Sequence, residues 1–190
     1  MTDYFALLQL PRNPWLDPDE LKARYQELTL ATHPDRARAN DPGVDFATVT
    51  EGYRVLSDHK LRIQHLLKTE GHETGSGQDV PAEFIELFSE IARFLRTTDD
   101  LLQRTATAQN ALSKSLLREE LLSSQKQGED ILARLTRWHA NALDKLSALN
   151  EPWTNDRATA VAKLSDLQQH LAYLTRWLEQ MRERQFQLSQ

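Results

Sequence analysis

The sequence contains no cysteine, and this absence excludes several kinds of site. Disulfide bonds, thiolate metal sites, cysteine catalysis and direct ligation of an iron–sulfur cluster by this chain are all ruled out. No apolar run approaches the roughly 18 residues that a membrane-spanning helix needs. The first ten residues, MTDYFALLQL, lack the basic segment and the cleavage site of a signal peptide. We therefore expect a cytoplasmic protein that does not bind membranes.

An excess of positive charge is also missing. Lysine and arginine number 23 against 28 aspartates and glutamates, which gives a net charge of −5. Nucleic-acid-binding domains usually show a basic face or stripe, so we expect no nucleic-acid partner. The six histidines show no spacing typical of a metal site with a third ligand. Because nothing else indicates an enzyme, we expect no catalytic residue, no metal and no cofactor.

The residues that prefer strands are scarce, and this predicts an all-α protein. Leucine occurs 31 times, against 5 valines and 4 isoleucines. Leucine is well accommodated in helices, whereas β-branched residues prefer strands. Residues 1–81 hold six of the seven prolines and five of the six glycines. The pattern predicts short helices and loops in the first part of the chain and long helices in the second.

A polar, glycine-rich stretch separates these two parts. Residues 71–81, GHETGSGQDVP, contain three glycines and a proline with almost no apolar side chain. Such a composition is typical of a linker or an exposed loop. We therefore predict a small domain over residues 1–70, a linker over 71–81 and a helical domain over 82–190.

Two helices of the small domain can be predicted from their ends. Asp17 is a favourable N-cap, Pro18 suits the first helical position and Glu20 completes a capping box. This helix is expected to end near His33, because the following Pro34 disfavours the helical conformation in the residue before it.

Asp41 and Pro42 are expected to start a second amphipathic helix, whose apolar face runs from Phe46 to Leu67, and Gly52 marks a close approach of the partner helix. The two helices are expected to run antiparallel. His33-Pro34-Asp35 would then lie at an exposed tip between them.

This arrangement resembles the J-domain, the co-chaperone module that acts on DnaK-type ATP-dependent chaperones. The resemblance rests on DYFALLQLP, on His33-Pro34-Asp35 between two helices and on EGYRVLSDHKLR, and it covers residues 3–67. The stretches RYQELTLATHPDR, DHKLRIQHLLKTEG and LNEPWTNDRATAVAKLSDLQQHL are similar to the HscB (Jac-type) branch of the family, which serves iron–sulfur cluster assembly.

The resemblance implies a role for each residue of the tripeptide. Asp35 would offer a carboxylate to an arginine of the chaperone, Pro34 would fix the direction of the loop, and His33 would help to pack it. The basic side of the same docking surface would come from Lys22, Arg24 and Arg36.

The C-terminal domain shows three apolar stripes at helical spacing, which predict a three-helix bundle. Its last turn is expected at Pro152, and its first turn lies near 110–115 or near 123–128. The three stripes are Phe84, Phe88, Ile91 and Leu95; Leu132, Leu135, His139, Ala142, Leu146 and Leu149; and Leu167, Leu171, Leu174, Leu178, Met181 and Leu188.

In HscB-type proteins this bundle binds the scaffold protein IscU through apolar and acidic residues of its first helix. In one alignment the apolar positions fall on Phe84, Ile85 and Phe88, while the acidic positions fall on Ser89 and Ala92. In a second alignment the matching segment is SLLREEL, residues 115–121, which keeps Glu119 as an acidic residue.

The resemblance therefore implies a co-chaperone that stimulates a DnaK/HscA-type ATPase and delivers a client, an IscU-type scaffold. Two alternatives stay open. In the first, the chain would be a J-domain co-chaperone for another client. In the second, it would be a helical adaptor that does not stimulate an ATPase. The sequence leaves the oligomeric state open.

Overall fold

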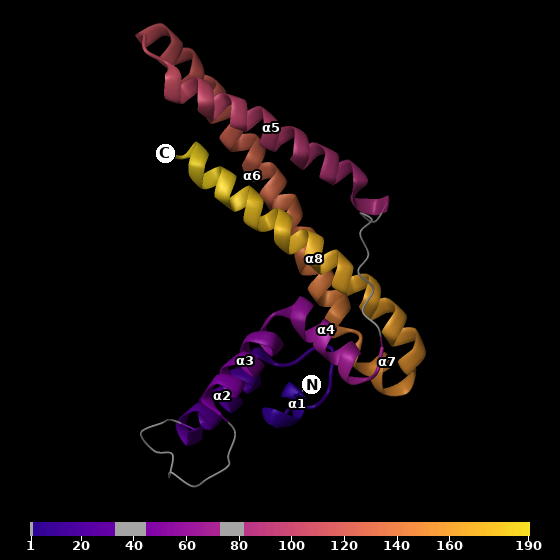
Figure 1. Cartoon of the computed structure of the whole chain (residues 1–190). Coiled ribbons are helices and arrows are strands. Elements are labelled where there is room, and N and C mark those ends of the chain that lie inside the picture. Colours follow the sequence, from indigo (N-terminus) through magenta and orange to yellow (C-terminus); the bar gives the residue numbers. More distant parts are fainter. Residues whose placement is uncertain (1, 33–44, 73–81) are drawn as a thin grey trace. The chain divides into compact units, whose positions relative to one another are not determined.

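The structure is a computed structural model that describes residues 2–32, 45–72 and 82–190 (Figure 1). All regular elements within these ranges are helices, which confirms the predicted all-α class. None of these helices is long and apolar enough to cross a bilayer. In chain order they are α1 (Tyr4–Leu7), α2 (Pro18–Thr32), α3 (Phe46–Ser57), α4 (His59–Thr69), the 3-10 helix η1 (Ala82–Phe84), α5 (Ile85–Thr107), α6 (Ala111–Ser147), α7 (Asn150–Asn155) and α8 (Arg157–Leu188).

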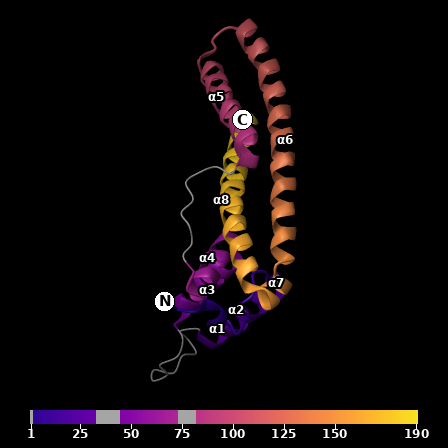
Figure 2. The ribbon, with the colours of Figure 1, turned by 90° about the vertical axis from the view of Figure 1, so that its right-hand side faces the viewer.

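The helices form two compact units. The N-terminal unit joins the described residues up to His72 to Leu143–Leu171, and the C-terminal unit joins Ala82–Ala142 to Ala172–Gln190. The two longest helices, α6 and α8, contribute to both units; α6 is one unbroken helix of 37 residues (Figure 2). The division into domains 1–70 and 82–190 stays a prediction.

The predicted start of α2 is confirmed. The side chain of Asp17 accepts hydrogen bonds from the backbone N–H groups of Asp19 and Glu20, at 2.8 and 3.1 Å. These bonds satisfy donors that have no partner inside the helix. Asp3 caps α1 in the same way, accepting from the N–H groups of Phe5 and Ala6.

The prediction of one continuous helix through residues 46–67 is wrong, because the chain breaks at Asp58. The predicted start at Asp41 and Pro42 lies outside the described residues. Asp58 has an extended backbone (φ −82°, ψ 118°), and its side chain accepts a hydrogen bond from the N–H of Leu61 at 2.8 Å. This N-cap ends α3 and starts α4. The apolar spacing on both sides of Asp58 suits a single helix, and the pattern alone did not reveal the break.

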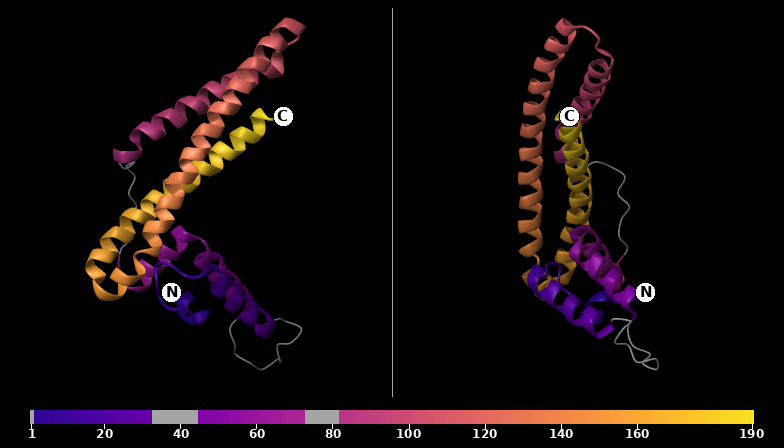
Figure 3. Two further views of the ribbon diagram at one scale, coloured as in Figure 1. Left: turned by 180° about the vertical axis from the view of Figure 1, so that it is seen from behind. Right: turned by 90° about the vertical axis from the view of Figure 1, so that its left-hand side faces the viewer.

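Gly52 does mark a close approach, but its neighbour is α1 rather than α2. A Cβ at this position would lie 3.2 Å from the Tyr4 ring and 3.3 Å from Leu7, both in α1. α2 packs beside α3 (Figures 1 and 3), where Tyr25 and Tyr53 stack with ring centroids 4.2 Å apart. The glycine therefore makes room for α1.

In the C-terminal unit, α5 packs against α6 and α8. Phe84 touches Trp138 of α6 and Trp177 of α8, with ring centroids 5.1 and 5.6 Å apart. The turn between α5 and α6 lies at 108–110, which selects the first of the two predicted positions. There the Asn110 side chain accepts a hydrogen bond from the N–H of Ser113 at 2.7 Å.

The apolar stripe predicted for α5 is partly wrong. Phe84 and Ile91 are buried, but Phe88 is 44% exposed and Leu95 is only half-buried. The predicted stripe lies to one side of the core face, because α5 has to cover two helices at once. All six residues of the stripe predicted for α8 are buried. The core face of α5 itself consists of Leu87, Ile91, Phe94, Thr98 and Leu101.

Candidate functional site

The residues expected to contact the chaperone are only partly described. His33, Pro34, Asp35 and Arg36 lie outside the described residues. The helices that flank them are in place, because α2 ends at Thr32 and α3 begins at Phe46. The prediction that the tripeptide lies at an exposed tip stays a prediction.

The two described basic residues of this surface do not share a face of α2. Lys22 is exposed, and Arg24 donates a hydrogen bond to Glu27 Oε2 at 3.1 Å. Residues two apart on a helix point in different directions, so Lys22 and Arg24 do not lie side by side on α2. The pair between Arg24 and Glu27 is exposed and contributes little to stability.

A buried arginine that the sequence reasoning missed holds the start of the chain against α4. Arg62 is 2% exposed; its Nε donates to the Pro14 carbonyl at 3.0 Å and its Nη1 to the Leu56 carbonyl at 2.8 Å. Burial lowers the pKa of Arg62 to about 10. Its charge therefore persists at neutral pH, where it ties the segment before α2 to the break between α3 and α4.

His65 connects α4 to α1. Its Nε2 accepts a hydrogen bond from the Tyr4 N–H at 3.0 Å, and its ring stacks on Tyr4 and Phe5. Accepting this bond requires a neutral ring with the proton on Nδ1. Burial lowers the pKa of His65 below its ordinary value, and this favours the same neutral form.

The α7 segment fastens the loop that precedes α2. Trp153 Nε1 donates to the Arg12 carbonyl at 2.6 Å. Asn150 accepts from the Trp15 N–H at 2.8 Å and donates to the Trp15 carbonyl at 3.1 Å. The sequence reasoning took the segment around Pro152 for a turn, and the structure shows a short helix with a buried tryptophan.

Charged side chains surround this tryptophan contact. The Arg157 guanidinium lies 4.1 Å from the centroid of the Trp153 ring, and its Nη1 is 3.4 Å from Glu70 Oε2. Arg12 contacts Glu70 at 3.5 Å and makes a close ion pair with Asp3. Burial opposes the ionisation of Asp3, but hydrogen bonds from Arg12 and from two backbone N–H groups lower its pKa below the ordinary value.

The three apolar residues predicted to contact a client have different environments. Phe84 is 1% exposed and lies between Trp138 and Trp177, so it belongs to the core. Ile85 is 53% exposed and Phe88 is 44% exposed. Only Ile85 and Phe88 are accessible to another protein.

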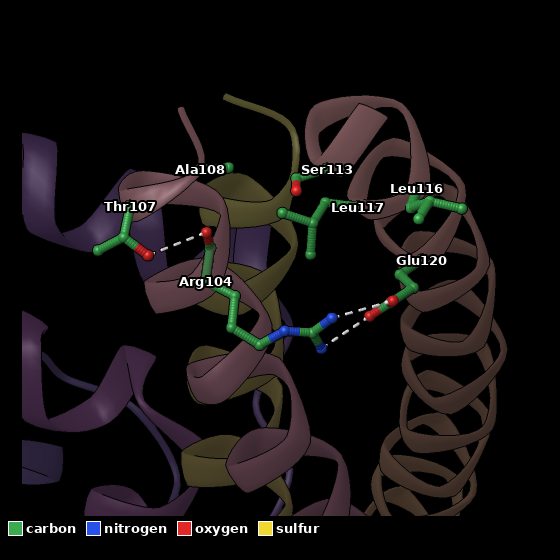
Figure 4. A pocket seen from close by; sticks show the side chains of 7 residues that line it. All are labelled: Arg104, Thr107, Ala108, Ser113, Leu116, Leu117 and Glu120. Atoms are coloured by element: carbon green, nitrogen blue, oxygen red, sulfur yellow. Dashed lines mark hydrogen bonds and ion pairs between the residues drawn. The ribbon is translucent and has the colours of Figure 1, made fainter. Parts of the chain in front are cut away.

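Glu119, which is exposed, lies far from these two residues. Arg134 pairs with Glu90 at 2.8 Å, and Arg104 pairs with Glu120 at 2.9 Å (Figure 4), so the two ends of the α5–α6 pair are fixed in register. Positions 119 and 134 are separated by about 22 Å along the helix at 1.5 Å per residue. The two predicted alignments therefore describe two different surfaces.

Phe88 lines a groove between α5 and α8 that the sequence reasoning did not find. The groove has a volume of about 380 Å³. The apolar residues of two helices converge here, and no single stretch of sequence carries the signal. The groove is lined by Phe88, Ile91, Ala92, Leu95, Tyr173, Arg176, Trp177 and Gln180.

Known proteins are similar to this chain in both of its units. Residues 3–65 match the DnaJ domain family. The chain is 27% identical to the co-chaperone protein HscB of Proteus mirabilis (strain HI4320) over 191 residues, which cover 97% of this chain and 98% of that protein. The chain thus carries a DnaJ domain match in its N-terminal unit and is similar to an HscB co-chaperone over nearly its whole length.

Other relatives agree with this result in part. The chaperone protein DnaJ of Wolbachia pipientis wMel is 41% identical over 76 residues, but these make up only 19% of that protein. The solved structure of HscB from Vibrio cholerae aligns with a TM-score of 0.55 at 18% identity, covering 96% of both chains. Human HscB aligns with a TM-score of 0.52 at 17% identity over 96% of this chain and 82% of that one. At these identities the two structures support the fold alone.

Proposed function

We propose that this chain is a co-chaperone that stimulates the ATPase of a DnaK/HscA-type chaperone and delivers an IscU-type iron–sulfur scaffold to it. The observation that carries the proposal is the combination of a DnaJ domain match over 3–65 with similarity to an HscB co-chaperone along the whole chain. A match to the DnaJ domain alone would support the chaperone partner but not the proposed client.

The N-terminal unit would contact the chaperone. His33-Pro34-Asp35 lies between α2 and α3, and Asp35 would accept a charge-assisted hydrogen bond from an arginine of the chaperone. Lys22 and Arg36 would add positive charge to the same surface. Arg24 would have to leave Glu27 before it could contribute.

The C-terminal unit would contact the client. Ile85 and Phe88 are the accessible members of the predicted patch, and Phe88 borders the groove between α5 and α8. Partly exposed aromatic residues beside a groove are typical of the centre of a protein–protein interface. Phe84 is excluded from direct contact by its burial.

The alternative of a different client is supported by one observation. Ser89 and Ala92 stand where the HscB resemblance calls for acidic residues, and Glu119 lies near the start of α6, at the opposite end of the α5–α6 pair from Phe88. A J-domain co-chaperone that recognises another client would carry the same N-terminal unit with a changed α5.

The proposal is tested by the steady-state ATPase rate of a purified HscA-type chaperone with the full chain added. We expect stimulation by the wild-type protein and loss of most of it in Asp35→Asn, which removes the charge and keeps the shape. Asp45→Asn is the matched control, because Asp45 is exposed and makes no side-chain capping bond to α3. Equal stimulation by Asp35→Asn and wild type would contradict the assigned role of Asp35.

A further inference from the structure

The groove between α5 and α8 differs in charge from the chain as a whole. The chain has a net charge of −5. Among the described residues that line the groove, Arg176 carries the only charge, and it is positive. The remaining lining is apolar or aromatic apart from Gln180. A surface of this kind selects a partner by apolar contact and by the sign of one charge.

Arg176 is available to such a partner. It is exposed on α8, one residue before the buried Trp177 that lies beside Phe88. Within the described ranges it makes no ion pair. A guanidinium at the edge of an apolar groove can hold a carboxylate through two parallel hydrogen bonds.

The acidic residue that follows the groove on the same face of α5 is already paired. Asp99 lies one turn beyond Leu95, and its carboxylate is held by Arg184 at 2.6 Å. Arg96, next to Leu95 and one turn beyond Ala92, is exposed and adds a second positive charge on the α5 side. The groove therefore has an arginine beside it on each of its two helices, and the acidic neighbour of Arg176 on α8 is the exposed Glu179, three residues further along.

We propose that this groove binds a client segment that presents apolar side chains together with a carboxylate, and that Arg176 is the partner of that carboxylate. The inference rests on the proposed function, since it specifies the chemistry of the client that the co-chaperone delivers. Phe88 on α5 would make the apolar contact with the client. Arg176 on α8 would select a client that presents a negative charge.

The test measures binding of a purified IscU-type scaffold to the full chain by titration calorimetry. We expect Arg176→Glu to weaken binding roughly tenfold, because an attraction is replaced by a repulsion at the interface. Phe88→Ser is expected to weaken binding as well, through lost apolar contact. The matched control is Arg182→Glu, an exposed arginine six residues further along α8 whose charge acts on His139 of α6.

A second measurement separates the ionic contribution from the apolar one. Raising the salt concentration should weaken binding of the wild type more than that of Arg176→Ala, since salt screens charged contacts. Far-ultraviolet circular dichroism of each variant checks that the helices are retained.

The possible failures are distinguishable. If the wild type does not bind the scaffold, the proposed client is wrong, and the inference falls with it. If the wild type binds and Phe88→Ser weakens binding, but Arg176→Glu binds as tightly as Arg182→Glu, the client stands and the inference is overturned. If Arg176→Glu and Phe88→Ser change only the self-association of the chain, a second copy occupies the groove, which also overturns it.

Discussion

Different kinds of contact stabilise the interior of each of the two compact units. In the N-terminal unit, single side chains make directed hydrogen bonds across long stretches of sequence, as Trp153 does to Arg12 and Arg62 to Pro14. In the C-terminal unit, repeated apolar stripes pack along helices, and their edges carry ion pairs such as Arg134–Glu90 and some long-range hydrogen bonds, such as that from Arg184 to the Leu95 carbonyl at 3.2 Å. A hydrogen bond between two given atoms allows only one arrangement of the segments that it joins. An apolar stripe constrains the buried face of a helix, so the residues at the edge of that face can be substituted.

This difference matches the two proposed tasks. A surface that contacts a conserved type of ATPase benefits from a rigid support, which α7 and the α1–α4 contacts provide in the N-terminal unit. A surface that selects a client is built from residues at the edge of a stripe, such as Phe88 and Arg176. Residues at the edge are substituted at little cost to the core.

The sharpest test of this comparison is to truncate one tryptophan in each unit. Trp153→Ala removes a side chain that is 2% exposed, its hydrogen bond to Arg12 and its contact with Arg157. We expect the free energy of unfolding to fall by about 3–5 kcal/mol. Trp138→Ala, at a site that is 38% exposed in the C-terminal unit, should cost less than about 2 kcal/mol.

Chemical denaturation followed by circular dichroism measures both values. Trp153→Phe keeps most of the ring volume and removes the N–H, so it separates the hydrogen bond from the packing. Equal losses for Trp153→Ala and Trp138→Ala would show that α7 does not anchor the N-terminal unit.

A smaller effect is expected from two histidines under acid. Burial lowers the pKa of both His65 and His139, so the unfolded chain binds a proton at each before the folded chain does. Stability is therefore complete above the ordinary histidine pKa of about 6.5 and falls as the pH drops below it. His65 also loses its hydrogen bond from the Tyr4 N–H when Nε2 is protonated.

The denaturation midpoint measured from pH 7.5 to pH 5 tests this prediction. His65→Gln should flatten the pH dependence more than His139→Gln, because of these two histidines only His65 accepts a backbone hydrogen bond from the described residues. An unchanged slope in His65→Gln would place the acid sensitivity elsewhere.

The local features of the fold could be predicted from the sequence. The Asp17 cap, the all-α class and the buried stripe of α8 follow from short-range rules that the neighbouring residues already satisfy. The break at Asp58 could not be predicted, because the apolar spacing continues across it. The cap bond to Leu61 competes there with helix continuation, and the spacing pattern does not show which of the two prevails.

The sequence reveals the parts of the candidate site that are local motifs and misses the parts that depend on how helices pack. The tripeptide His33-Pro34-Asp35 is a contiguous motif, and the sequence shows it directly. The client surface depends on which side of α5 faces the core. The predicted stripe, which starts at Phe84, and the observed core face, which starts at Leu87, share only Ile91. Trp153 and Arg12 are 141 residues apart, so no local pattern predicts their contact.

The central claim is that one unit engages the chaperone and the other brings the client. It is tested most directly by the steady-state ATPase rate of an HscA-type chaperone with this protein, in the presence and absence of an IscU-type scaffold. The account predicts stimulation by the protein alone and a further increase with scaffold that exceeds the sum of the separate effects. No stimulation at concentrations well above micromolar, with or without scaffold, would contradict it.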